Sequence, residues 1–320
     1  MRRVGLYTHP ACGAHSGGPG HPERPERLAA VEERLRLSGQ LEELVHRRAE
    51  PASVETLGTV HDAAYLVRME RAFLEGAAFV DSPDANGGAA TPLAARAASA
   101  AVLEATARVL AGDLDAAFAA VRPPGHHAEE GLAMGFCFTN HVALAARAAR
   151  EVGGLERVAI VDFDVHHGNG TQHLFERDPS VLYASLHESP HYPGTGAASE
   201  RGLGDGEGAT LNCPMNAGAD NETYTQAFTE KILPAIDAFG PDMILISAGF
   251  DAHQADPLGS INLTTEYYAW MTRRLMECAD HHCNGRILSV LEGGYDLDAL
   301  ALSVAVHIET LKGFGSVEKP

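Results

Sequence analysis

Residues 157–170 read RVAIVDFDVHHGNG, a short apolar run that ends in two aspartates and two histidines. An apolar run of this length is typical of a strand buried on both faces of a parallel sheet. In open parallel sheets, ligands bind beyond the carboxyl ends of the strands. The stretch therefore predicts an α/β fold whose functional site lies at that edge of the sheet.

The same pattern, an apolar run followed by polar residues or glycines, recurs along the chain. We expect strands at 3–8, 115–125, 157–164, 242–251 and 286–296. Alanine-rich or amphipathic stretches of helical length lie between them, at 92–111, 138–152, 221–238 and 264–281. Strands that alternate with helices predict a three-layer α/β/α sandwich around a central parallel sheet. No repeat or linker divides residues 1–320, so we expect a single domain.

Two segments, 80–91 and 186–212, are rich in Gly, Pro, Ser or Asp and are expected to be irregular. Irregular segments of this length in compact domains are usually functional loops. We therefore expect these two loops to lie near the site.

Composition restricts the class of protein. The chain carries 43 acidic and 24 basic residues, a formal net charge of −19 that disfavours direct binding to nucleic acid and favours a cationic substrate. No apolar run approaches the roughly 20 residues that cross a membrane. Five scattered cysteines without a CxxC pair, and an N-terminus unlike a signal peptide, predict a cytoplasmic protein. A homo-oligomer is compatible with this composition.

Four of the expected strands end in polar motifs: RPPGHH (122–127), DFDVHHGN (162–169), AGFDAH (248–253) and EGGYD (292–296). If these ends meet at one edge of the sheet, a single cleft contains the following residues: His126, His127, Asp162, Asp164, His166, Asp251 and Tyr295. Such a cluster of carboxylates and imidazoles is a candidate metal or catalytic site.

The motif DxDxH indicates a metal site. Alternation along a strand places Asp162, Asp164 and His166 on one side. Asp164, His166 and Asp251 would supply three ligands and leave a position open to water, which is typical of a catalytic zinc. A site without a thiolate also admits Fe²⁺ or Mn²⁺. The alternative for this motif alone is a strand end with buried ion pairs.

The adjacent histidines have different expected partners. Asp162 could accept a hydrogen bond from His126, and Asn169, a neutral amide, could do so from His127. Unlike partners separate the pKa values of two histidines, as acid and base roles require. Tyr295 could donate to a developing oxyanion, although alone it is more typical of the edge of a core.

Taken together, the motifs resemble the histone deacetylase and acetylpolyamine amidohydrolase superfamily, in particular its class II branch and bacterial members. They span residues 20–296 in the order and spacing of that family: GHPERPERL (20–28), VHDAAY (60–65), RPPGHHA (122–128), GFCFTNHVA (135–143), DFDVHHGNGTQ (162–172), YPGTGAASERG (192–202), SAGFDAHQADPLG (247–259) and LEGGYD (291–296).

The resemblance implies the arginase–deacetylase fold and zinc-dependent removal of acyl groups from lysine side chains or small amines. It implies Asp164, His166 and Asp251 as zinc ligands. His127 would be the general base and then acid, His126 with Asp162 would stabilise charge, and Tyr295 would polarise the carbonyl. The substrate would lie against Gly135, Phe136, Tyr192, Leu258 and Gly294. A structural K⁺ is implied beside Asp162, Asp164, His166, Ser185 and Leu186.

Some positions depart from the family. Tyr192 stands where Phe is usual, and the segment 83–92 differs from the loop that grips the substrate, so we predict no residue there. Polyamine-selective members have an acidic residue at the position of Leu258. We therefore expect acyl-lysine to be preferred, unless Glu188 supplies the missing charge. The alternatives are an acetylpolyamine amidohydrolase, a two-manganese arginase-type hydrolase and an inactive protein that binds acylated ligands.

Other polar residues are expected to be structural. His61 and His187 should cap turns or pack locally, and Cys137 should be a buried apolar residue. The stretch CADHHC (278–283) ends a predicted helix and lacks the two spaced ligand pairs of a zinc knuckle.

Overall fold

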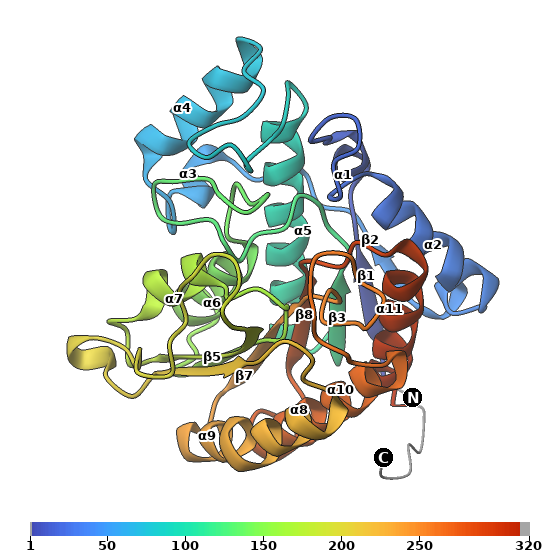
Figure 1. The fold of residues 1–320 in the computed structure, drawn as a ribbon, viewed down its shortest axis with the longest axis vertical. Helices are drawn as coiled ribbons and strands as arrows, with labels where there is room; N and C mark the ends of the chain where they lie inside the picture. The colour runs from blue at the N-terminus through green and yellow to red at the C-terminus, as the bar shows by residue number, and fades with distance from the viewer. Residues whose placement is uncertain (1, 314–320) are drawn as a thin grey trace.

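The computed structural model describes residues 2–313, and its centre is a single parallel sheet (Figure 1). Eight strands follow the order β2-β1-β3-β8-β7-β4-β5-β6, and all neighbouring pairs are parallel. The strands are β1 (Val4–Tyr7), β2 (Val45–Arg47), β3 (Ala116–Ala119), β4 (Val158–Asp162), β5 (Val181–Glu188), β6 (Thr210–Met215), β7 (Met243–Ala248) and β8 (Ile287–Leu291). The predicted α/β fold with a parallel sheet is confirmed.

The helices cover both faces of this sheet. They are α1 (Pro10–Ala14), α2 (Glu26–Leu37), α3 (Val54–Leu57), α4 (Ala63–Leu74), α5 (Thr91–Leu110), α6 (His141–Glu151), α7 (Asn169–Phe175), α8 (Asn221–Ala227), α9 (Leu233–Phe239), α10 (Thr265–His282) and α11 (Leu297–Leu311). A short π-helical turn, Phe228–Ile232, joins α8 to α9. The helices predicted at 92–111, 138–152, 221–238 and 264–281 are thus confirmed within a few residues. Within residues 2–313, no helix has the length and apolar character needed to span a bilayer.

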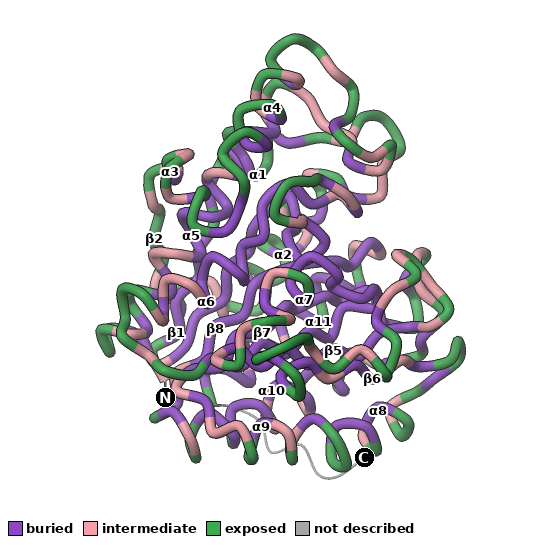
Figure 2. Tube along the Cα trace, turned by 90° about the vertical axis from the view of Figure 1, so that its left-hand side faces the viewer, coloured by how far each residue is buried: buried purple, intermediate pink, exposed green. Residues whose placement is uncertain are grey.

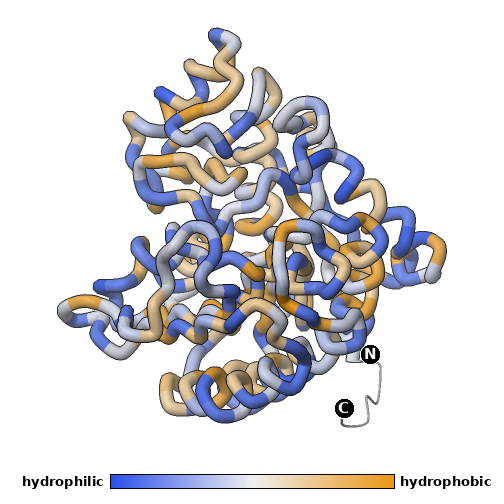
Figure 3. Tube along the Cα trace, viewed as in Figure 1, coloured by the Kyte–Doolittle hydropathy of each residue, from blue (hydrophilic) through white to orange (hydrophobic). Residues whose placement is uncertain are grey.

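Alternation along β4 separates the two layers of the core. Ala159 and Val161 pack in one cluster with residues of α2, α8, α10 and α11, whereas Val158 and Ile160 pack in a second cluster with α4, α5 and α6. Figure 2 shows the buried trace gathered around the sheet, with exposed segments at the periphery. In Figure 3, α2 is largely hydrophilic. Accordingly, it buries only Arg27, Val31 and Leu35.

The sequence does not predict β2, β5 or β6, and the expectation that 186–212 is irregular throughout is wrong at both ends. β5 continues to Glu188 and β6 begins at Thr210. The polar residues of β5 obscure it as a strand, yet all eight of its residues are buried. They tolerate burial because they bond one another, as the 2.9 Å contact between Ser185 Oγ and His187 Nδ1 shows. The other predicted strands are shorter than expected because their polar ends leave the sheet as loops.

Candidate active site

The polar motifs meet at the carboxyl edge of four adjacent strands. β3, β8, β7 and β4 are neighbours in the sheet, and the loops after them carry the motifs RPPGHH, EGGYD, AGFDAH and DFDVHHGN. In the register of the sheet, Asp162 lies opposite Ser247 on one side and Ser185 on the other. Topology thus brings together residues that are up to about 170 positions apart in the chain.

A buried carboxylate holds the histidine pair. Oε2 of Glu292 accepts hydrogen bonds from the backbone N–H of Gly125 (2.7 Å) and of His126 (3.1 Å). A Cβ on Gly125 would lie 2.8 Å from backbone atoms of His141 and Thr139, so only glycine fits this turn. The end of β8 therefore fixes the loop that follows β3.

Asp164, His166 and Asp251 form a buried cluster that could hold a metal ion. Their ligand atoms all lie within 4.8 Å of one another. One oxygen of each carboxylate is bound by backbone N–H groups: Gly293 donates to Asp164 Oδ2 and Val165 to Asp251 Oδ1, each at 2.8 Å.

Asp251 Oδ2 lies 3.2 Å from His166 Nδ1, but it is buried and has no hydrogen-bond partner. A Cβ on Gly293 would lie 1.9 Å from this oxygen, so the space beside it exists only because residue 293 is glycine. Buried charged oxygens normally pair or coordinate a metal. The donor set and this unpaired oxygen fit a divalent ion.

The two adjacent histidines have unlike partners. His126 Nδ1 lies 3.0 Å from Asp162 Oδ2, and His127 Nδ1 lies 2.8 Å from Asn169 Oδ1. Burial alone would lower the pKa of His126, but the carboxylates of Asp164 and Asp162 outweigh it and raise this pKa to about 10. Burial, with the neighbouring His126 and His166, holds the pKa of His127 well below its usual value. One ring is therefore suited to carry charge and the other to stay neutral.

A pocket of about 360 Å³ opens beside these residues. It is lined by Asp84, His127, Gly135, Phe136, His166, His191, Tyr192, Pro257, Leu258 and Tyr295. The Phe136 and Tyr295 rings meet edge to face at 6.0 Å, and the Tyr192 and His127 rings at 5.1 Å. The walls are therefore largely aromatic, as a pocket for an aliphatic chain requires.

Arg27, from the N-terminal motif, positions Tyr295. Its guanidinium donates to the carbonyls of Gly294 and Glu292, each at 2.6 Å, and lies 5.0 Å from the centre of the Tyr295 ring. The backbone N–H of Tyr295 donates to Asp256 Oδ2 at 2.6 Å. Tyr295 is thus held rigidly, with 8% of its surface exposed.

Comparison with known proteins agrees with this geometry. Residues 21–311 match the model of the histone deacetylase domain. This chain belongs to the histone deacetylase family. It is 38% identical over 330 residues to histone deacetylase 14, chloroplastic, of Arabidopsis thaliana, covering 98% of this chain and 77% of the relative.

Two further relatives support this membership of the family. The chain is 40% identical over 302 residues to the human polyamine deacetylase HDAC10, covering 91% of this chain and 44% of that relative. The crystal structure of the HDA15 HD domain superposes with a TM-score of 0.93 at 36% identity, covering 98% of this chain and 90% of that one. The arginase–deacetylase fold expected from the resemblance is therefore confirmed, and the chain is a deacetylase-type hydrolase.

Most of the site residues predicted from the sequence lie together. His126 bonds Asp162, His127 bonds Asn169, and all the other predicted residues except Gly294 belong to the ligand cluster or line the pocket. Gly294 differs, because it lies outside the pocket lining and its carbonyl is bound by Arg27. Glu188 also lies outside the lining, is buried, and accepts a hydrogen bond from Ser260 N at 2.7 Å.

Sequence reasoning missed three residues of the pocket: Asp84, His191 and Pro257. Asp84 belongs to the loop 80–91, where Gly and Asp indicate a turn but no particular contact. Its Oδ1 is buried without a hydrogen-bond partner. His191 precedes Tyr192, and its ring centre lies 5.0 Å from that of His166. Adjacency to a predicted pocket residue was the signal available for His191.

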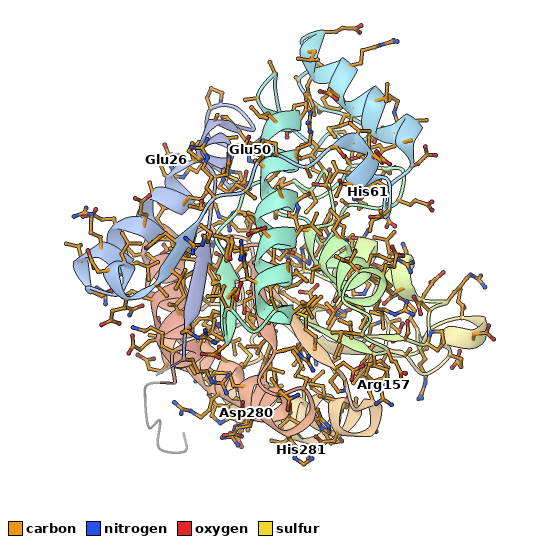
Figure 4. The ribbon with its side chains drawn as sticks, turned by 180° about the vertical axis from the view of Figure 1, so that it is seen from behind. Glu26, Glu50, His61, Arg157, Asp280 and His281 are labelled. Atoms are coloured by element: carbon orange, nitrogen blue, oxygen red, sulfur yellow. The ribbon has the colours of Figure 1, made fainter. Side chains whose placement is uncertain are left out.

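The residues expected to be structural are buried or distant from the site. His61 bridges the carbonyl of Glu129 (2.9 Å) and the N–H of Asn140 (2.8 Å). Cys137 is buried, and burial raises its pKa well above the usual value. In Figure 4, His281 lies at the end of α10, at the lower edge of the molecule and far below His61.

Proposed function

We propose that the chain is a zinc-dependent amidohydrolase that removes acetyl or other acyl groups from lysine side chains or related amines. The observation that carries this proposal is the buried Oδ2 of Asp251, which has no hydrogen-bond partner and lies within a cluster of two carboxylates and one imidazole. No thiolate is in this cluster, so Fe²⁺ also fits the same ligands. A divalent ion held there would polarise an acyl carbonyl and lower the pKa of a water.

The side chains around the cluster divide the remaining chemistry. His127, kept neutral by its low pKa, is suited to take a proton from the attacking water and to deliver it to the leaving amine. His126 retains its proton and places a positive charge beside the reacting centre. Tyr295 supplies a hydroxyl that can donate to the oxyanion developing on the substrate.

The pocket walls favour an aliphatic acyl-amine. Phe136 and Tyr192 would flank the methylene groups, and the carbonyl of Gly135 would accept a hydrogen bond from the substrate amide. Leu258 is apolar and offers no partner to a distant second ammonium, whose desolvation would be unfavourable. An acylated lysine in a peptide therefore fits better than an acetylated polyamine.

A specific observation favours the polyamine alternative. Asp84 lines the pocket, and its buried Oδ1 has no partner, so it could accept a hydrogen bond from a peptide N–H or from a second ammonium. The human relative is also named a polyamine deacetylase. The two substrate classes are distinguished by kcat/KM.

The test combines metal analysis with two substrates. We expect one zinc per chain and a higher kcat/KM for an acetyl-lysine peptide than for N-acetylspermidine, with Leu258→Glu shifting the ratio toward the polyamine. A tenfold preference of the wild type for the polyamine, about 1.4 kcal/mol, would overturn the lysine assignment. Two manganese ions with guanidine hydrolysis, or ligand binding without turnover, would overturn the amidohydrolase itself.

Four further predictions belong with this proposal. We expect a structural K⁺ beside Asp162, Asp164, His166, Ser185 and Leu186, of which Asp162 and Ser185 are opposite each other in the sheet. The five cysteines are buried and free, which agrees with a cytoplasmic location. A single domain over residues 1–320 stays a prediction, as does the absence of nucleic-acid binding.

A further inference from the structure

A series of hydrogen bonds runs from His127 away from the pocket to the surface. Asn169 accepts from His127 through Oδ1, and its Nδ2 donates to Oε1 of Glu129. Both oxygens of Glu129 also accept from His173 Nδ1, at 2.9 and 3.0 Å. Glu129 and His173 line a surface cavity of about 280 Å³ that shares no lining residue with the pocket.

The position of the Glu129 carboxylate is well determined. Its backbone N–H donates to the carbonyl of Leu132 at 3.0 Å, and its own carbonyl accepts from the buried ring of His61 at 2.9 Å. His173 binds the carboxylate from the solvent side. The residue is therefore held from both sides, close to Asn169.

The chemistry of these groups determines which atom of Asn169 faces His127. An ionised carboxylate can only accept hydrogen bonds, so Glu129 requires the amide nitrogen of Asn169 to face it. The amide oxygen then faces His127 Nδ1. In a neutral imidazole only one nitrogen carries the proton, and an oxygen acceptor opposite Nδ1 places it there. His127 Nε2 is then left unprotonated, as a base in the pocket must be.

The other contacts of Asn169 are weaker. Its Nδ2 lies 3.3 Å from the carbonyl of His127 and 3.3 Å from Met134 Sδ, which is a poor acceptor. Without Glu129, a flipped amide would present its nitrogen to His127 and would favour the opposite tautomer.

We propose that Glu129 is a positioning residue that sets the orientation of the Asn169 amide and, through it, the tautomer of His127. This inference rests on the proposed function of His127 as the base. Glu129 would act through Asn169, without contact with the substrate.

The first test removes the acceptor. Glu129→Met should lower kcat about tenfold, as loss of such supporting hydrogen bonds typically does, with zinc content and Tm unchanged. Glu129→Gln retains an acceptor oxygen and should stay within about threefold of the wild type. Glu130→Met is the matched control, since Glu130 is exposed on the same cavity, and its kcat should be unchanged.

The second test reverses the direction in which Glu129→Gln changes kcat. Asn169→Asp would place two carboxylates at hydrogen-bonding distance and should lower kcat about tenfold or more. Adding Glu129→Gln supplies an amide that can donate to the introduced carboxylate. The same substitution that slightly lowers kcat in the native background should therefore raise it, at least threefold, in the Asn169→Asp background.

The tautomer is read directly from the ¹⁵N chemical shifts of His127 in histidine-labelled protein. The wild type should carry the proton on Nδ1, and Glu129→Met should show a substantial Nε2–H population. Unchanged shifts and a kcat within twofold of the wild type in Glu129→Met would overturn the inference. So would a further loss of kcat in the double variant. Because the shifts do not depend on turnover, a wild type that fails to hydrolyse acyl-amines would refute the proposed function alone.

Discussion

The hydroxyl of Tyr295 is the group whose removal most directly tests the proposed chemistry. Tyr295→Phe deletes one oxygen but keeps the ring, which packs against Phe136 at 6.0 Å and under the Arg27 guanidinium at 5.0 Å. The backbone hydrogen bond from residue 295 to Asp256 is also unaffected. The ring should therefore stay in place, and Tm should change little.

Loss of one oxyanion donor lowers kcat by on the order of 10² to 10³, or about 2.7 to 4 kcal/mol. The assay is kcat and KM for an acetyl-lysine peptide, together with zinc content and thermal unfolding. The effect should fall on kcat, because the hydroxyl acts on charge that develops only in the transition state. Tyr192→Phe is the control, since it removes the other phenol of the pocket, which is 36% exposed, and should cost at most about threefold. A Tyr295→Phe enzyme within tenfold of the wild-type kcat, or one altered only in KM, would refute the assignment.

Five further substitutions test three other parts of the structure. Asp164→Ala, His166→Ala and Asp251→Ala should each abolish stoichiometric metal binding and activity, and full metal content in two of the three would disprove the ligand set. His127→Ala should lower kcat at least as much as Tyr295→Phe; near-native turnover would mean that the proton passes through His126. Burial lowers the pKa of His307, which bonds Thr272 and Ser289 and does not line the pocket, to about 3. The folded state therefore stays neutral while the unfolded state gains a proton below about 6.5. The free energy of unfolding therefore falls as pH falls through this window. His307→Gln should reduce this loss between pH 7 and pH 5 by about 2 kcal/mol, measured by urea unfolding. An unchanged dependence of the unfolding free energy on pH would contradict a neutral, buried His307.

The motifs at strand ends were predictable because short apolar runs precede them and because parallel topology sends all such ends to one edge. Asp164, His166 and Asp251 follow from that rule, although Asp164 and His166 lie in the loop just after β4, where strand alternation no longer applies. The strand β5 was not predictable in the same way, since Ser185 and His187 make its sequence resemble a loop. Their burial becomes acceptable through a hydrogen bond between them and another from His187 to the carbonyl of Gly196, which a pattern of hydropathy does not reveal.

Residues that reach the site through loops were harder to predict. Asp84 lies about 40 positions before the first strand-end motif, RPPGHH, and its place in the pocket depends on the path of the 80–91 loop. Glu129 directly follows a recognised motif, yet its contacts with Asn169 and His173 arise only from the packing of α7. Such contacts are set by tertiary geometry and leave no periodic signal in the sequence.

The position of β8 in the sheet determines when, during synthesis, the sheet and the site can be completed. β8 is the last strand of the described chain, yet it pairs with β3 on one side and β7 on the other. Until a ribosome has released residues 287–291, the sheet consists of two separate halves, each with an open edge. Glu292, which orients the histidine pair, is made later still. Nascent chains are therefore both incomplete and prone to mispairing until β8 and Glu292 have left the ribosome, a period in which a chaperone is most useful.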